Sequence, residues 1–357
     1  MKTILRGLVC FVLAINSFNM ATAQESSEAS GTLIVLNKSG ASASIISLKT
    51  SQSLTTIPTG IGPHEVAVSP DGHTAVVSNY GSREPGSSLT VIDLREQKVI
   101  NTIDLEKYQR PHGIVFLPDG KSVLVTAEAQ KALLKIDLDR GRVLDAIDTG
   151  QEVSHMVALS PTARQAFVAN IRSGSVTVID LQKAEAVATI KTGAGAEGID
   201  VSPDGREVWV SNRADDSISL IDAESLQVAA KLESKTFPIR VKFTPNGQYV
   251  LVSNARSGDV AVFDAQKRQE VRRIAMPVQA RENKEGRLFS DRFGESPVPV
   301  GILVHPNGGH AYVANTNADI VAVIDLNSWQ ITDQLKAGRE PDGLGFSLIE
   351  LEVQAGR

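Results

Sequence analysis

A unit of about 42 residues recurs along this chain, and this period constrains the fold more than any other feature. Each copy reads as an apolar segment, a tight turn with proline, a second apolar segment, and an alternating run that ends in Asp. Several short strands in a period of this size predict a β-propeller with four-stranded blades. The turn prolines, spaced by 48, 43, 42, 42 and 61 residues, are Pro70, Pro118, Pro161, Pro203, Pro245 and Pro306.

The chain contains six complete copies and one that is split between its two ends. Residues 341–346 read only as an inner strand, whereas residues 32–37, 43–48 and 54–58 read as strands two to four. Joining the ends completes a seventh blade and removes the free sheet edges of an open array. We therefore expect an all-β fold, a single seven-bladed propeller over residues 32–350 with negligible helix.

The N-terminus reads as a targeting segment. Lys2 and Arg6 precede the apolar run 7–15, and residues 21–23 form a small-residue cleavage site. This pattern predicts a secretory signal peptide over residues 1–23, followed by a short disordered leader over residues 24–31. Cys10, the one cysteine of the chain, lies inside the signal peptide, so the mature protein has no thiol for a disulfide or a metal. We expect a periplasmic or secreted protein without a membrane anchor.

The charge balance argues against a nucleic-acid partner. The chain has 36 basic and 41 acidic residues, and loss of Lys2 and Arg6 takes its net charge from −5 to −7. Nucleic-acid binding is driven by neutralisation of phosphates, which an acidic protein does not supply. Aromatic residues make up only 4% of the chain, too few for a base-stacking platform. We expect a monomer that binds no nucleic acid.

Two copies of the repeat carry a resemblance to a known family. The run 167–170 (FVAN), followed by 175–180 (SVTVID), and the run 312–315 (YVAN) resemble the repeat of the YVTN-family, lactonase-like propellers. The resemblance covers nearly the whole mature chain and implies the propeller fold. Similar propellers serve as lactonases, lyases, haem- or quinone-associated proteins and binding modules, so function has to be argued from the site.

One column of the repeat gathers chemically active side chains. The residue six positions before each turn proline begins an inner strand, and inner strands converge on the axis of a propeller. Imidazole and carboxylate are ligands of divalent transition metals, so we expect such a metal at this column, although the imidazoles could instead bond neighbouring carbonyls. The expected ligands, from five adjacent blades, are His64, His112, His155, Glu197 and Asp342; Ile239 and Val300 complete the column.

A second group of cationic residues is expected near the same mouth. Arginines follow the second strand of four blades, and one more lies next to the histidine column: Arg83, Arg172, Arg213 and Arg256, with Arg240. Guanidinium groups near one opening of an acidic protein favour a small anionic ligand, such as a carboxylate or phosphate. The alternative is that these arginines are solvated on polar loops.

The spacing of 61 residues indicates an insertion over residues 276–300, between the fourth strand of one blade and the inner strand of the next. A long loop with Leu288, Phe289 and Phe293 beside a polar mouth is a candidate lid. It could equally cover a partner interface or pack on the rim.

Two functions remain open from the sequence. The first is binding of a small anionic ligand at the top face, with lactonase-like or lyase-type chemistry in which the metal is a Lewis acid and His112, His155 or Glu65 carries protons. The alternative is a non-enzymatic binding or scaffold protein, accessory to a periplasmic redox or quinone enzyme, with a protein partner. The chain has no phosphate-binding glycine loop and no haem-attachment cysteine pair.

Overall fold

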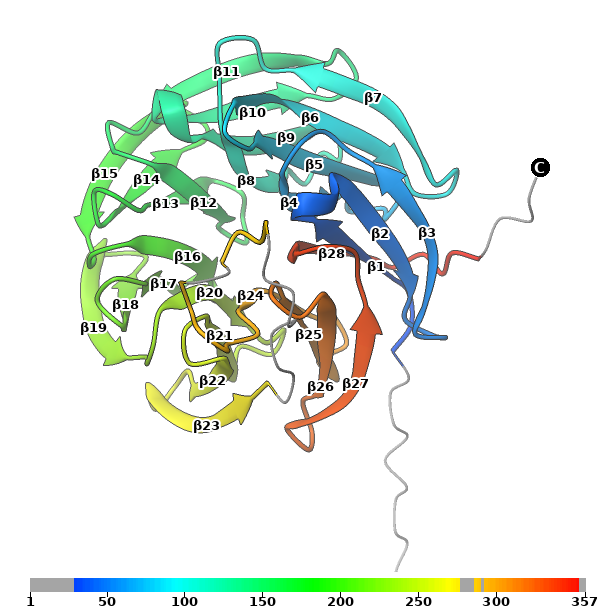
Figure 1. The fold of residues 1–357 in the computed structure, drawn as a ribbon. Coiled ribbons are helices and arrows are strands. Elements are labelled where there is room, and N and C mark those ends of the chain that lie inside the picture. The colour runs from blue at the N-terminus through cyan, green and yellow to red at the C-terminus, as the bar shows by residue number, and fades with distance from the viewer. Residues whose placement is uncertain (1–28, 277–285, 290–291, 353–357) are drawn as a thin grey trace, which may run out of the picture.

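The computed structural model describes residues 29–276, 286–289 and 292–352, which form a ring of seven four-stranded antiparallel sheets (Figure 1). This confirms the predicted fold class. The expected signal peptide, residues 1–23, and the leader up to residue 28 lie outside the described residues. Within the described ranges, no helix is long and apolar enough to span a membrane.

Blades 1 to 6 follow one another along the chain, each built from the innermost strand outward. Blade 1 comprises β4 (Pro63–Val68), β5 (Thr74–Gly81), β6 (Pro85–Asp93) and β7 (Lys98–Asp104). Blade 2 comprises β8 (Pro111–Phe116), β9 (Ser122–Ala127), β10 (Ala132–Asp137) and β11 (Arg142–Asp148). Blade 3 comprises β12 (Ser154–Leu159), β13 (Gln165–Asn170), β14 (Ser175–Asp180) and β15 (Glu185–Lys191).

The next three blades repeat the same order. Blade 4 comprises β16 (Ala196–Val201), β17 (Glu207–Asn212), β18 (Ser217–Asp222) and β19 (Gln227–Glu233). Blade 5 comprises β20 (Pro238–Phe243), β21 (Tyr249–Asn254), β22 (Asp259–Asp264) and β23 (Gln269–Ala275). Blade 6 comprises β24 (Pro299–Val304), β25 (His310–Asn315), β26 (Ile320–Asp325) and β27 (Gln330–Lys336). The only helical elements in the described ranges are two 3₁₀ turns, η1 (Lys38–Gly40) and η2 (Glu128–Gln130).

Blade 7 is built from both ends of the chain, as the split repeat predicts. Its innermost strand is β28 (Pro341–Ser347), followed by β1 (Thr32–Asn37), β2 (Ser42–Ser47) and β3 (Gln52–Pro58). β28 pairs with β1 in antiparallel register, with Thr32 opposite Ser347 and Leu33 opposite Phe346. The Thr32 hydroxyl also donates a hydrogen bond to the Ile349 carbonyl at 2.7 Å. The pairing satisfies the backbone groups that would otherwise form two free edges.

The hydrophobic core lies between blades rather than inside any one of them. Seven clusters of buried side chains each combine residues of two adjacent blades, for example Val76 of blade 1 with Val125 of blade 2. The alternating apolar residues of the middle strands supply both faces of each sheet to these clusters. A blade therefore depends on its two neighbours for its burial.

Glycines hold the axis of the ring narrow. Gly113, Gly198, Gly301 and Gly343 occupy the same position of four innermost strands. A Cβ atom added at any of them would lie 2.0–2.6 Å from a backbone oxygen of the next blade. At these points the innermost strands pack backbone against backbone, which brings the side chains at the strand starts close to one another.

The described part of the insertion packs over blades 5 and 6, at the end of the ring where the innermost strands begin. Phe293 and Val298 are buried against Phe237 and Ala255. The Arg287 guanidinium also pairs with the Asp319 carboxylate, with 3.1 Å between Nη1 and Oδ1.

Loss of ring closure is expected to destabilise all seven blades. Deletion of the chain from Glu340 onward removes β28 and exposes the inner edge of β1. It also removes apolar side chains from the two cores that blade 7 forms with its neighbours. We expect aggregation and loss of a cooperative thermal transition, measured by calorimetry and size-exclusion chromatography. A truncated protein that stays monomeric with unchanged melting would contradict this closure.

A point substitution tests the same contact with less damage. In Gly343→Ala the new Cβ would lie 2.3 Å from the His64 carbonyl oxygen, so β28 and β4 must separate. Overpacking of this kind costs about 1–3 kcal/mol of unfolding free energy. Gln334→Ala, on the exposed face of the outer strand β27, is the control and should change stability by less than about 0.5 kcal/mol.

Candidate functional site

The five polar residues of the predicted column line one cavity of about 220 Å³, which we call the top pocket. Each lies second in its innermost strand, and the narrow axis brings the five strand starts together. His112 is 1% exposed and Asp342 is 3% exposed, so these side chains are in a protein interior rather than on a rim. Other residues of the lining are Lys38, Tyr80, Glu128, Arg213, Phe237, Ile239, Arg240, Phe289, Arg292 and Val300.

A row of hydrogen bonds crosses one wall of the top pocket. The Tyr80 hydroxyl donates to Glu128 Oε2 at 2.7 Å, and Glu128 Oε1 bonds Nδ1 of His155. The other ring nitrogen of His155 lies 3.4 Å from Glu197 Oε1. Burial by itself lowers the pKa of His155, but the Glu128 and Glu197 carboxylates outweigh it and raise the pKa above its ordinary value of 6.5.

The Arg240 guanidinium occupies the centre of the carboxylates. Its Nη2 bonds Glu65 and lies 3.9 Å from Asp342 Oδ1, and its Nη1 lies 3.7 Å from Glu197 Oε1. Burial raises the pKa of Glu65. Glu197 also pairs with Arg213 at 2.6 Å, and against the effect of burial its cationic partners lower its pKa to about 2. Arg240 therefore joins side chains of blades 1, 4, 5 and 7.

His64 and His112 differ from His155 because no carboxylate contacts them. The rings of His64 and His112 lie edge to face at 4.5 Å, and His64 stacks on Tyr80 at the same distance. Burial lowers the pKa of both, so both are neutral at pH 7. Nδ1 of each ring is buried and has no hydrogen-bond partner in the described part of the chain. Buried polar atoms of this kind are rare and call for a partner.

The structure separates the remaining predicted residues into two groups. Arg213 and Arg240 line the top pocket, and Arg256 lies at its mouth over the Phe237 ring. Arg83 and Arg172 are exposed and do not line the pocket. Glu65 points instead into a second cavity of about 530 Å³, the channel enclosed by the seven innermost strands. Arg240 lines both cavities and lies between them.

Sequence reasoning missed several residues of the pocket. Lys38 lies in η1 and Glu128 in η2, the corresponding short loops of blades 7 and 2, and Tyr80 extends beyond the usual end of a second strand. The insertion adds Phe289 and Arg292. Arg240 and Glu65 were predicted as site residues, but their pairing was not. A sequence signal for it was available: in the position after the predicted column, only Glu65 and Arg240 are charged, and their signs are opposite.

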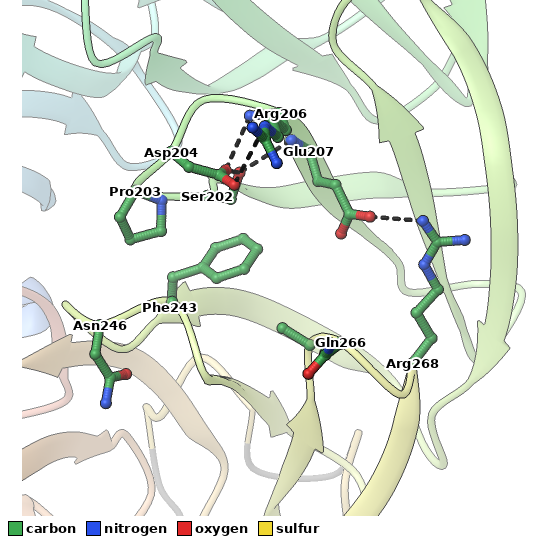
Figure 2. Close-up of a pocket in the computed structure, with 11 residues that line it drawn as sticks. Ser202, Pro203, Asp204, Arg206, Glu207, Phe243, Asn246, Gln266 and Arg268 are labelled. Atoms are coloured by element: carbon green, nitrogen blue, oxygen red, sulfur yellow. Dashed lines mark hydrogen bonds and ion pairs between the residues drawn. The ribbon is translucent and has the colours of Figure 1, made fainter.

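A larger cavity of about 830 Å³ lies at the opposite end of the ring, between blades 4 and 5 (Figure 2). Turn residues line it, and its charged groups are already paired: Arg268 with Glu207 at 2.7 Å, and Arg206 with Asp204 at 3.8 Å. It contains no histidine and no cluster of buried charges. Most of the buried charged and imidazole side chains among the described residues line the top pocket instead.

Comparisons with known proteins support the fold. The Cytochrome D1 heme domain family matches residues 118–240, about a third of the chain. A solved chain of Kuenenia stuttgartiensis hydrazine synthase superposes with a TM-score of 0.68 and 20% sequence identity, over 81% of this chain and 90% of that chain. At this identity the likeness shows the fold. A search of curated proteins finds no match.

The expectation of a divalent transition metal, held by His64, His112, His155, Glu197 and Asp342, is wrong. The family that matches residues 118–240 is described as a haem domain, so the match suggests haem rather than a divalent ion. The two carboxylates expected as ligands are instead engaged by cations: Glu197 by Arg213 and Arg240, and Asp342 by Lys38 at 2.9 Å. The Arg240 guanidinium takes the central cationic position. A different trio, His112, Glu128 and His155, has ligand atoms within 4.8 Å of one another, but Glu128 and His155 already bond each other.

Haem itself does not fit the top pocket. Pockets that enclose drug-sized molecules measure about 300–1,000 Å³ and are mostly apolar. The top pocket measures about 220 Å³, and seven charged side chains line it. A tetrapyrrole would have to break the ion pairs of Arg240 and Glu197 in order to enter.

The three pocket histidines should give the protein a stability maximum near pH 6.5. His155 has a raised pKa. Its contribution to the free energy of unfolding is therefore complete below pH 6.5 and is lost as pH rises through its folded-state pKa. His64 and His112 have lowered pKa values. Their contribution to the free energy of unfolding is therefore complete above pH 6.5 and is lost as pH falls toward their folded-state pKa values. Urea unfolding at several pH values between 5 and 8 measures this curve.

Glu128→Gln separates the two contributions. It removes the carboxylate that raises the pKa of His155 most. The decline of the unfolding free energy above pH 6.5 should therefore become smaller, while the decline below pH 6.5 remains. A stability that rises steadily from pH 5 to pH 8, or an unchanged decline in Glu128→Gln, would show that His155 is not held as an imidazolium.

Arg240→Met should be among the most destabilising substitutions in the chain. It leaves Glu65, Glu197 and Asp342 facing one another without their shared cation. Removal of one partner of a buried ion pair costs about 3–5 kcal/mol. In the double variant Arg240→Met/Glu65→Gln, part of the lost unfolding free energy should be recovered, because the second substitution removes one buried, unpaired carboxylate. Equal stability of the single and double variants, measured by chemical unfolding, would argue against a shared counter-ion.

Proposed function

We propose that this chain is an exported binding propeller that holds a small anion in its top pocket and serves a redox enzyme without carrying a redox cofactor of its own. The observation that carries the proposal is the charge of the lining. Four cationic side chains, Lys38, Arg213, Arg240 and Arg292, face three carboxylates in the lining. This local positive charge contrasts with a net charge of −5 for the chain. A cleft of this kind concentrates anions against the field of the rest of the protein.

The comparisons favour a role beside a redox enzyme. The two matches described above, a haem domain of a cytochrome and a chain of hydrazine synthase, belong to redox proteins. The top pocket is too small and too charged for haem, so this chain would contribute ligand binding or a docking face rather than electron transfer. The predicted signal peptide, residues 1–23, would take it to the periplasm, where the partner protein would be found.

A second function, general acid catalysis on a small lactone or related substrate, is favoured by the bond between His155 and Glu128. A carboxylate that orients an imidazole is the arrangement of many catalytic dyads. The Glu128 carboxylate also raises the pKa of His155, which favours a proton on its ring. Turnover of a lactone panel that falls in Glu128→Gln would support this role, whereas no turnover by the wild-type protein would leave the binding function alone.

Anion binding is tested by calorimetric titration with acetate, glycolate, malonate, sulfate and phosphate. We expect at least one of them to bind with a dissociation constant below about 1 mM, and to raise the melting temperature by mass action. Binding should weaken at high salt, because salt screens the attraction between an incoming anion and the exposed Arg292 of the lining.

The controls separate the top pocket from the rest of the molecule. His73→Asn, at a turn of the opposite face, should bind as the wild type does, whereas Arg213→Ala should bind more weakly. Titration with haem should give no saturable change in the haem absorption spectrum. Saturable haem binding, or no anion binding at any pH between 5 and 8, would refute the proposed function.

A further inference from the structure

An unusual group of side chains surrounds the mouth of the top pocket, and we call it the mouth cluster. It consists of three phenylalanines and three arginines: Phe237, Phe289, Phe293, Arg213, Arg256 and Arg292. The guanidinium carbons of Arg213, Arg256 and Arg292 lie 5.5, 5.4 and 5.1 Å from the centroid of the Phe237 ring. Arg256 and Arg292 also lie 6.0 and 5.3 Å from the Phe293 ring.

The mouth cluster contains more positive charge than its surroundings neutralise. Arg213 pairs with Glu197, but neither Arg256 nor Arg292 has a carboxylate partner among the residues that the structure describes. Three like charges around one ring repel each other, and the ring faces offset only part of this repulsion. Two guanidinium forks are therefore free to bind a planar anion such as a carboxylate.

The inner end of the same pocket presents the opposite situation. Every cation there has a partner: Lys38 pairs with Asp342, Arg240 with Glu65, and His155 with Glu128. The uncharged groups without a partner among the described residues are the rings of His64 and His112, which are 8% and 1% exposed and have buried Nδ1 atoms without hydrogen bonds. Within the same ranges Arg240 Nη1 and Asp342 Oδ1 also lack a hydrogen bond, but both residues belong to ion pairs. A neutral imidazole can donate to or accept from an uncharged oxygen.

From these two ends we infer that the ligand of the top pocket is a short 2-hydroxy or 2-oxo monocarboxylate, with its carboxylate on Arg256 and Arg292 and its hydroxyl or carbonyl oxygen on His64 and His112. This inference rests on the proposed anion binding and names its chemical class. The volume of about 220 Å³ limits the ligand to a few carbon atoms. A second carboxylate would be placed beside Glu197 and Asp342, which disfavours short dicarboxylates.

Ligand comparison tests the inference without changing the protein. Glycolate and pyruvate should bind about tenfold more tightly than acetate, which lacks the second oxygen, because one hydrogen bond to a buried ring is lost. They should also bind more tightly than malonate, which carries a second charge. Equal affinity for acetate and glycolate, or tighter binding of malonate, would overturn the inference while leaving the proposed anion binding intact.

Variants of the mouth cluster test the outer end. Arg292→Ala and Arg256→Ala are exposed positions that should fold normally. Each should weaken glycolate and acetate binding alike, by about tenfold, since both ligands use the same carboxylate contact. Arg206→Ala, an exposed arginine of the opposite face (Figure 2), is the matched control and should bind as the wild type does.

His112→Asn tests the inner end and should weaken glycolate binding to the level of acetate while leaving acetate unchanged. If this variant does not fold, the ligand comparison in wild-type protein decides the question alone. Glycolate affinity that is unchanged in both arginine variants would overturn the assignment of the mouth cluster. Absence of binding by every anion tested would instead refute the proposed function.

Discussion

The pairing of β1 with β28 is the constraint on which the rest of this structure depends. It joins strands separated by more than 300 residues in sequence and converts seven similar sheets into a ring with a single axis. Each inter-blade core is formed by two adjacent sheets. Loss of the pairing between β1 and β28 would therefore disrupt the two cores that blade 7 forms with blades 6 and 1. The convergence of the strand starts on the top pocket is a further result of closure, because only a closed ring holds seven innermost strands at equal distances from one axis.

The centre of that axis is held by charge as well as by backbone packing. Four innermost strands bring glycine to the same position, while two others bring Glu65 and Arg240, which meet across the axis. This pair divides the central space into the top pocket and the channel below it. The arrangement satisfies the rule that a buried charge requires a nearby partner, and it places a buried ion pair at the floor of the top pocket.

The sequence predicted the architecture because each repeat unit can be recognised from residues that are close together in the chain, and the number of units then determines the whole ring. Turn prolines and strand patterns recur often enough to identify each blade, and the split copy at the ends identifies the closure. The column of His64, His112, His155, Glu197 and Asp342 follows from the same alignment. Its chemistry did not follow, because ligand character depends on which cations lie nearby, and Lys38, Arg213 and Arg240 reach the column from other positions of the repeat. Tyr80, Glu128 and Arg292 come from an extended hairpin, a 3₁₀ turn and the insertion. These segments differ between blades, so the repeat does not align their residues with the column.

The wall of the top pocket also has an uneven composition. The polar column extends through blades 7, 1, 2, 3 and 4, whereas blades 5 and 6 contribute Ile239 and Val300 under the insertion. The seven positions share one backbone geometry, so a substitution at any of them changes the lining without changing the scaffold. The ring thus behaves as a set of interchangeable sites around a fixed frame, and a related chain could acquire a different ligand through one or two changes at Ile239 and Val300. Because Ile239 and Val300 also pack against Phe293 of the insertion, such changes would alter the lining and the seating of the insertion together.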